Sequence, residues 1–367
     1  MISKDSSLVP RGRQAPELES KRMLKAGIIG AGRMGMTHFA LLGSHPQVEV
    51  AAVTDDSSVV TGSLSRYRPD IKLYGEYRKM LAGEKLDLVL ICTPPNLHTE
   101  MIEAAVERDV SVFVEKPFTL TAIEARRILE RVASKGNGTR LALQVGYVNR
   151  FNDVFIKAKA LLDRQMIGKV LSFRSEMFGR TVIQKSSGNG WRSKRENGGG
   201  CLYDFGSHAI DLAVFFMGRP EKIIGSHLSS LYSTHTDDAV RATLLYPQGL
   251  VGGLYVNWSD ESCRKPGNKV EILGEEGKIV ADNHELKVYM KREKGAYRQG
   301  WNTIYITDLF NNVPFYVRGN EFTRQIYHFV DCVLDPGLAN QSSFADAALT
   351  QEIIDVIFAD SPKHGGL

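Results

Sequence analysis

The sequence predicts a doubly wound α/β domain, built on a parallel sheet, followed by an α+β domain with a large, mostly antiparallel, open-faced sheet. Three observations support this. A glycine-rich turn follows the first apolar strand, apolar strands and helices alternate up to about residue 146, and strands of alternating polarity dominate from about residue 221. We therefore expect a first domain at residues 24–146 and a second at 147–367, after a polar, tag-like, disordered segment at 1–23.

The first element is a short apolar strand at 24–29 that leads directly into a G-x-G-x-x-G turn and a helix reaching about Leu42. This order is the fingerprint of a Rossmann dinucleotide-binding domain. The first glycine permits the tight turn, the second lets a pyrophosphate approach the backbone, and the third allows close packing of helix and strand. The helix N-terminus offers N–H groups to the phosphates. We expect cofactor contacts from Gly30, Gly32, Arg33, Met34 and Gly35.

The second strand, at 48–53, ends in Thr54-Asp55-Asp56, about where the ribose-binding acid of such a domain lies. Asp55 could accept hydrogen bonds from both ribose hydroxyls, while its charge would repel a 2′-phosphate. The expected cofactor is therefore NAD in preference to NADP. Asp55 could also be a turn residue before a helix cap at Ser57 or Ser58, and that role would not exclude ribose binding.

Three more apolar strands, at 86–91, 110–114 and 141–145, alternate with helices at 99–108 and 121–134. Such repetition implies a parallel sheet whose ligands bind at the carboxyl ends of the strands. After Gly146 come a helix (151–163), a strand (170–176) and a polar loop (184–197). Strands at 223–232, 239–246, 251–258, 269–273 and 278–281 follow. Helices at 321–334 and 344–358 end the chain, and the last of them is a candidate to pack back on the first domain.

The stretch 198–218 predicts a helix with a glycine-rich entrance, because apolar residues recur at helical spacing and a Gly-Arg-Pro stop signal follows. Asp204 and His208 are four residues apart, so a regular α-helix would place them on one face. A carboxylate beside an imidazole raises the histidine pKa and orients the ring, which suits a proton acceptor. The same pattern also fits a solvated helix face. Asp211, a further turn along, could bind substrate or close a polar cluster.

Together these motifs resemble the family named for glucose-fructose oxidoreductase, inositol dehydrogenase and MocA, from about Leu24 to the C-terminal helix. The most specific parts are Glu115-Lys116-Pro117 after a strand and the glycines before Asp204 and His208. The resemblance implies that the substrate lies between nicotinamide and the Asp204/His208 helix. It implies that Lys116, Asp204 and His208 are catalytic and contact the substrate. It also implies cofactor contacts from Thr93, Pro94, Asn96, His98, Glu115, Lys116 and Gln144, and substrate contacts from Tyr147, Asn149, Arg150 and Trp191.

Some of these roles have alternatives of equal or similar weight. His98 could serve helix entry and packing, and Arg150 could form a structural ion pair. The cations Arg150, Arg180, Lys185, Arg192, Lys194 and Arg195 could favour an anionic substrate or belong to a solvated loop.

The activity that the resemblance implies is NAD(P)-dependent oxidation of a ring secondary alcohol, in an inositol, sugar, glycoside or nucleotide sugar. His208 would take the hydroxyl proton, Asp204 would hold its ring, and Lys116 would stabilise the alkoxide. Two alternatives remain open: a redox-neutral glycosidase that oxidises its sugar transiently, and a non-catalytic sugar- or NAD-sensing regulator. The family also implies a homodimer or homotetramer that assembles through the open sheet face.

Composition narrows the possible partners. Hydrophobic residues make up 43% and charged residues 24%, and the net charge of +4 includes no dense Lys/Arg run, so nucleic acid is not an expected partner. The four cysteines are far apart without a C-x-x-C pair, so neither a metal site nor a disulfide framework is expected, and free thiols fit the cytoplasm. No apolar stretch has the roughly 18 residues that span a membrane.

Overall fold

The computed structural model describes residues 22–136, 141–185, 190–309 and 313–362. The predicted tag-like segment therefore lies almost wholly outside the described residues, as does part of the predicted loop at 184–197. Within the described ranges, no helix is both long and apolar enough to cross a membrane.

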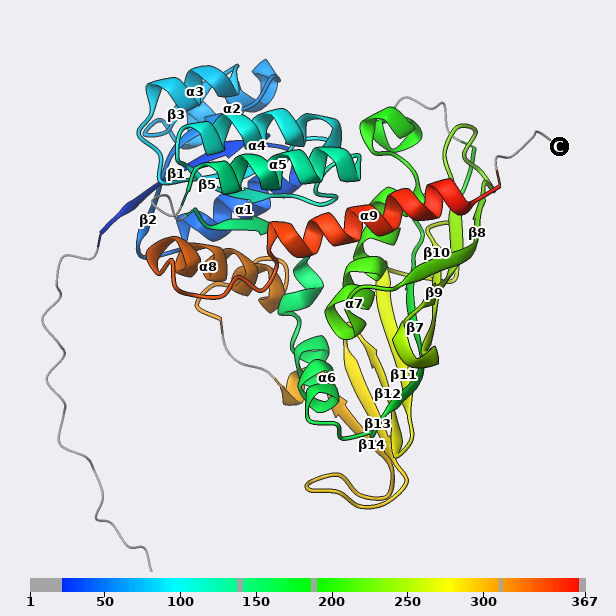
Figure 1. Ribbon diagram of the computed structural model, residues 1–367. Coiled ribbons are helices and arrows are strands. Elements are labelled where there is room, and N and C mark those ends of the chain that lie inside the picture. The colour runs from blue at the N-terminus through cyan, green and yellow to red at the C-terminus, as the bar shows by residue number, and fades with distance from the viewer. Residues whose placement is uncertain (1–21, 137–140, 186–189, 310–312, 363–367) are drawn as a thin grey trace, which may run out of the picture.

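The first sheet has six parallel strands in the order β3-β2-β1-β4-β5-β6, with helices on both faces (Figure 1). This confirms the predicted doubly wound domain, and the strand order reverses between β1 and β4. Its elements are β1 Leu24–Ile29, α1 Arg33–Gly43, β2 Val48–Thr54, α2 Ser58–Tyr67, β3 Lys72–Tyr74, α3 Tyr77–Gly83, β4 Leu88–Ile91, α4 His98–Glu107, β5 Ser111–Val114, α5 Ala122–Ser134 and β6 Leu143–Val145. Strands β4 and β5 are buried at every residue, as their apolar sequences require.

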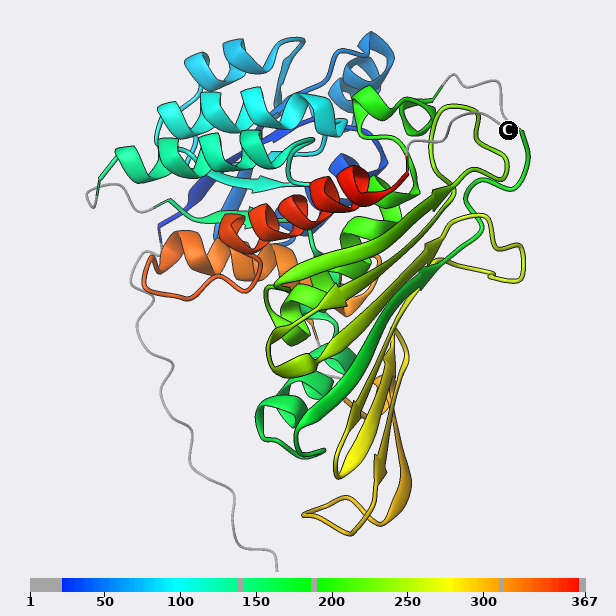
Figure 2. The ribbon, with the colours of Figure 1, turned by 45° about the vertical axis from the view of Figure 1, so that its right-hand side comes forward.

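The second sheet has eight strands in the order β14-β13-β12-β11-β7-β10-β9-β8. It is antiparallel except for the pair β7–β10, which confirms the mostly antiparallel prediction. Its strands are β7 Val170–Phe178, β8 Lys222–Ser229, β9 Ala239–Leu245, β10 Val251–Asn257, β11 Gly267–Gly274, β12 Gly277–Asp282, β13 Glu285–Met290 and β14 Gly300–Tyr305. Helices α6 (Asp153–Asp163), α7 (Ser207–Met217) and α9 (Phe344–Asp360) cover one face, and the other face is open (Figure 2).

The last two helices reconnect the second sheet to the first domain. Helix α8 (Asn320–Leu334) packs Ile326, Phe329 and Val330 into the core that contains Leu24 and Phe113. Helix α9 contacts α5 on one side and α7 on the other. Helix α9 thus contacts both domains, and α8, which follows the second sheet in the chain, packs into the core of the Rossmann domain.

Candidate active site

The glycine-rich turn between β1 and α1 fits a dinucleotide phosphate. Gly30 has φ +89°, and a Cβ on Gly35 would lie 1.9 Å from the Gly30 carbonyl oxygen, so both positions need glycine. Gly32 is exposed, and a Cβ there would meet nothing within 4 Å. No side chain caps the N-terminus of α1 at this residue. The backbone amides of the turn can therefore face a phosphate, which is the arrangement that NAD requires.

Asp55, at the end of β2, has the turn role that we considered and also joins the glycine-rich turn. Its Oδ1 accepts a hydrogen bond from Ser57 N at 2.9 Å, and its Oδ2 accepts one from Ala31 N at 2.7 Å. Ser57 caps α2. These contacts fix the carboxylate beside the turn and leave its ribose role as a prediction.

The predicted cofactor residues in the loop after β4 and at the start of α4 differ in exposure. Pro94 and Asn96 are exposed and Thr93 is half-buried, so all three can reach a ligand at this edge. His98 is fully buried, and its ring nitrogens lie 2.9 Å from the Pro117 carbonyl oxygen and 3.0 Å from that of Thr93. The cofactor contact predicted for His98 is therefore wrong, because the ring connects two loops inside the protein.

Glu115 is held by a residue that the sequence did not reveal. His38 of α1 is fully buried, and its Nε2 lies 2.7 Å from Glu115 Oε1. Burial alone would raise the pKa of Glu115, but His38 and Lys116 lower it below its ordinary value. The only available signal for His38 was its place three residues after Gly35, on the buried side of α1.

Gln144 is a second correction. Its side chain is fully buried, and its Nε2 donates a hydrogen bond to the Gln325 carbonyl oxygen of α8 at 2.9 Å. The predicted cofactor contact is wrong, because Gln144 connects β6 to α8.

Lys116 and Asp204 form the centre of the site, where the two domains meet. Lys116 Nζ lies 2.6 Å from Asp204 Oδ1 and donates to the Asp204 carbonyl oxygen at 3.0 Å. Arg192 Nε donates to the other carboxylate oxygen at 2.8 Å. Burial would raise the pKa of Asp204, but the two cations reverse this and hold it well below its usual range. Asp204 is therefore a carboxylate with both oxygens bound to cations.

His208 has a different partner from the one expected. Residues Leu202–Gly206 form a π-helical turn before α7, and this wider turn does not align residues four apart as an α-helix does. In the described residues no hydrogen bond joins Asp204 to His208, and His208 Nδ1 is buried without a partner. Burial and then Lys116 lower the pKa of His208 to about 3, although Asp204 partly offsets this. The predicted rise in pKa is thus wrong, and His208 is neutral at neutral pH.

Three of the predicted substrate residues are less accessible than expected. Tyr147 is buried, with its ring edge-on to His208 at 6.3 Å between centroids. Asn149 is also buried and accepts a hydrogen bond from Asn283 Nδ2 at 3.1 Å. Trp191 is half-buried, and the Arg192 guanidinium stacks over its ring at 4.4 Å. Tyr147 and Trp191 therefore contact residues of the site, whereas the side chain of Asn149 is bound to Asn283.

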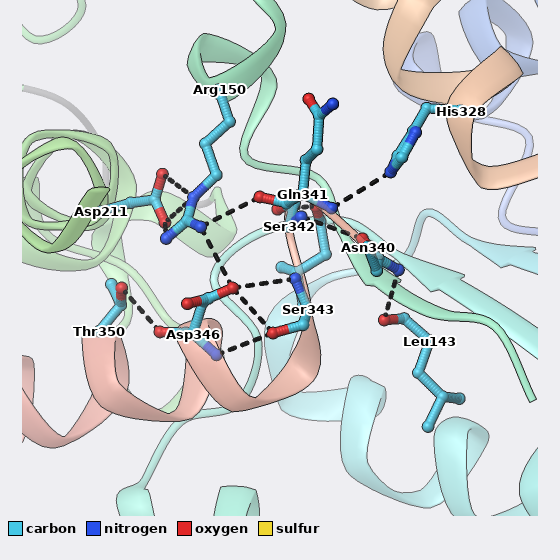
Figure 3. A network of polar contacts seen from close by, with 11 residues as sticks. Leu143, Arg150, Asp211, His328, Asn340, Gln341, Ser342, Ser343, Asp346 and Thr350 are labelled. Carbon is cyan, nitrogen blue, oxygen red and sulfur yellow. Dashed lines mark hydrogen bonds and ion pairs between the residues drawn. The ribbon is translucent and has the colours of Figure 1, made fainter. Parts of the chain in front are cut away.

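Arg150 belongs to a buried ion-pair cluster instead of the substrate site (Figure 3). Its guanidinium lies 2.8 Å from Asp211 Oδ1 on α7 and 3.2 Å from Asp346 Oδ2 on α9, and it donates to the Gln341 carbonyl oxygen at 3.0 Å. Arg150 is 4% exposed and Asp211 1%. The predicted substrate contact is wrong, and the structural alternative that we considered for Arg150 and Asp211 holds.

The remaining cations of the predicted loop are only partly free for a ligand. Arg192 binds Asp204, and Arg195 lies 3.6 Å from Asp237 and stacks over Phe358. Lys185 and Lys194 are exposed. Arg192 and Arg195 are thus paired with carboxylates of the protein.

Comparison with known proteins supports the fold and the NAD-binding domain. Residues 24–143 match the model of an oxidoreductase family with an NAD-binding Rossmann fold, and residues 155–280 match the GFO/IDH/MocA C-terminal domain. An uncharacterized oxidoreductase of Schizosaccharomyces pombe is 31% identical over 61% of each chain. Inositol 2-dehydrogenase of Salmonella typhimurium is 30% identical over 58% of this chain and 61% of its own.

These two relatives are matched over about three fifths of their own length. Among solved structures, levoglucosan dehydrogenase in complex with NADH and levoglucosan has the same fold, with a TM-score of 0.81 at 23% identity, over 92% of this chain and 97% of that one.

Proposed function

We propose that this chain, which belongs to the GFO/IDH/MocA family of oxidoreductases and carries its NAD-binding Rossmann domain, transfers a hydride between a ring secondary alcohol and NAD. The observation that carries the proposal is the cluster of Lys116, Asp204 and a neutral His208. This cluster adjoins the carboxyl ends of the parallel strands, where β5 runs into Glu115 and Lys116 and where the Gly30 turn also lies.

Each residue of the cluster has a distinct role. NAD, when bound, accepts the hydride from the carbinol carbon or returns it. Burial and then Lys116 lower the pKa of His208, so the ring is neutral and a ring nitrogen lone pair can accept the hydroxyl proton. Lys116 can donate a hydrogen bond to the substrate oxygen and stabilise its developing negative charge. Asp204 positions Lys116, since its Oδ1 lies 2.6 Å from Nζ.

The proposed substrates are cyclitols and sugars. Relatives include an inositol 2-dehydrogenase, and a structural neighbour binds levoglucosan. The proposed preference for NAD over NADP rests on Asp55, whose carboxylate is fixed at the end of β2.

Absorbance of the reduced nicotinamide tests this proposal. NAD and NADP are supplied in parallel, with a panel of inositols, free sugars, anhydrosugars, glycosides and nucleotide sugars. We expect turnover with NAD on at least one compound, and a fall in kcat of about 10²-fold or more in Lys116→Met and His208→Asn. Lys169→Met, an exposed lysine between α6 and β7, is the matched control.

Full activity in either site variant would refute the mechanism. Cleavage of a glycoside without net NADH would indicate the redox-neutral glycosidase. Binding of NAD and sugar without any conversion would indicate the regulator.

We also propose that two copies assemble through the open sheet face. Leu171, Val251 and Leu273 are 47%, 44% and 42% exposed on strands β7, β10 and β11. Light scattering should give a dimer or tetramer mass, and Leu273→Lys should lower it. A monomer mass for the unaltered protein would contradict the proposal.

A further inference from the structure

Arg318 reaches the glycine-rich turn from the far end of the chain. It lies just before α8, after the second sheet has been completed. Its Nη1 is 3.5 Å from Met34 Sδ, in the first turn of α1, and its guanidinium stacks over the Phe322 ring at 5.2 Å. Met34 and Phe322 thus hold the guanidinium beside the N-terminus of α1.

The charges around this position are unbalanced. Arg33, the first residue of α1, carries a second guanidinium, and partial desolvation together with the charge of Arg33 lowers the pKa of Arg318. Across the described ranges, neither arginine forms an ion pair with a carboxylate. The first turn of α1 contains no acidic residue, and its N-terminus carries a partial positive charge. The carboxylate of Glu115, whose charge also acts on Arg318, is bound to His38.

Two guanidiniums that form no ion pair among the described residues, beside a helix N-terminus, make a site for an anion. We infer that Arg318 acts with Arg33 to bind the diphosphate of the dinucleotide cofactor. The inference rests on the proposed function, because that function brings a dinucleotide to this turn.

The diphosphate is favoured over a ribose 2′-phosphate by the surroundings. A 2′-phosphate would lie at the end of β2, where the Asp55 carboxylate is fixed by Ala31 N and Ser57 N. Arg318 instead contacts Met34 in α1. Cofactor binding would then connect the start of α8 to the glycine-rich turn.

Direct titrations test this without using catalysis. NADH, NADPH, ADP and adenosine are titrated into the unaltered protein, Arg318→Met, Arg318→Lys and Arg298→Met. Arg298 is an exposed arginine between β13 and β14, at the end of the sheet far from the Rossmann domain (Figure 1). It therefore controls for the loss of one positive charge.

We expect Arg318→Met to bind NADH and ADP about tenfold more weakly, because one arginine–phosphate contact is lost, and to bind adenosine with unchanged affinity. Arg318→Lys should lose less affinity for NADH and ADP, since its positive charge remains although the planar guanidinium is absent. Arg298→Met should bind all ligands as the unaltered protein does. Melting temperatures without ligand should agree across the set, because Arg318 is exposed.

Unchanged affinity for ADP in Arg318→Met would overturn the inference. A loss of affinity for adenosine as large as that for ADP would overturn it as well. A loss confined to NADPH would assign Arg318 to a 2′-phosphate and also overturn it. If the unaltered protein binds neither NADH nor ADP, the proposed function fails, whereas binding without turnover leaves the inference about Arg318 standing.

Discussion

The buried cluster around Arg150 gives the sharpest prediction of stability. Arg150 connects the segment after β6 to Asp211 on α7 and Asp346 on α9 (Figure 3). Replacing it by methionine keeps most of the side-chain volume but leaves Asp211, which is 1% exposed, without its cation. Breaking a buried pair in this way typically costs about 3–5 kcal/mol. We expect Arg150→Met to lower the free energy of unfolding by about that amount at pH 7.

The pH dependence of this loss has a defined sign. Burial already raises the pKa of Asp211 from 3.8 to about 6, against the opposing effect of Arg150. Without Arg150 the pKa of folded Asp211 rises further, and it exceeds the value in the unfolded chain. The contribution of protonated Asp211 to the stability of the variant is then fully present below about pH 4, and it is lost as the pH rises through the pKa of folded Asp211. The gap between Arg150→Met and the unaltered protein should therefore shrink from pH 7.5 to pH 5.

Urea unfolding at both pH values measures this gap. Arg219→Met is the matched control, because Arg219 follows α7 and lies 2.7 Å from Glu352 of α9, but its side chain is 62% exposed. An exposed pair contributes about 0–1 kcal/mol, so this control should change little at either pH. A loss below about 1 kcal/mol in Arg150→Met, or a loss that is the same at both pH values, would refute the reasoning.

Two further predictions concern the cofactor turn and the active site. Gly35→Ala should unfold or strongly destabilise the protein, because its Cβ would lie 1.9 Å from the Gly30 carbonyl oxygen. Gly32→Ala should instead keep the melting temperature of the unaltered protein and bind NADH at least about tenfold more weakly. Equal effects of the two substitutions in thermal melts and NADH titrations would contradict this. The pKa of His208 is about 3 in the folded protein, against an ordinary value of 6.5. The free energy of unfolding therefore falls as the pH falls below about 6.5, because the unfolded chain binds a proton at this histidine and the folded protein does not. His208→Asn should reduce that pH slope by about 1.4 kcal/mol per pH unit between pH 6 and 4 in urea unfolding, and an unchanged slope would be evidence against a neutral buried His208.

Elements with a continuous buried face could be predicted from the sequence, and elements without one could not. Strands β4 and β5 are buried throughout and read as apolar runs. Helix α2 buries only Leu64, so its sequence lacks a helical apolar stripe. Strand β14 lies at the edge of its sheet and alternates between half-buried and exposed residues, without a buried side that would produce an apolar pattern.

The sequence predicted which residues meet at the site better than it predicted their partners. Lys116 and Asp204 are 88 residues apart and yet lie at 2.6 Å, and it is the family resemblance that implied a shared site for them. His208 was predicted to lie beside Asp204 because the two are four residues apart, but the π-helical turn does not place residues four apart on one face. The pairs of His38 with Glu115 and Arg150 with Asp211 are 77 and 61 residues apart, so no local pattern contains them.

The charges of the site explain why Asp204 binds cations and not the imidazole. A carboxylate that is 5% exposed needs a compensating charge, which a neutral imidazole cannot supply and Lys116 and Arg192 can. Burial of His208 disfavours a positive charge on its ring, and the nearby Lys116 ammonium acts in the same direction. Burial therefore contributes most to keeping His208 neutral, and Lys116 adds to this effect. A proton acceptor must begin in that neutral state, so the role proposed for His208 rests on its buried position beside Lys116 and not on a direct bond to Asp204.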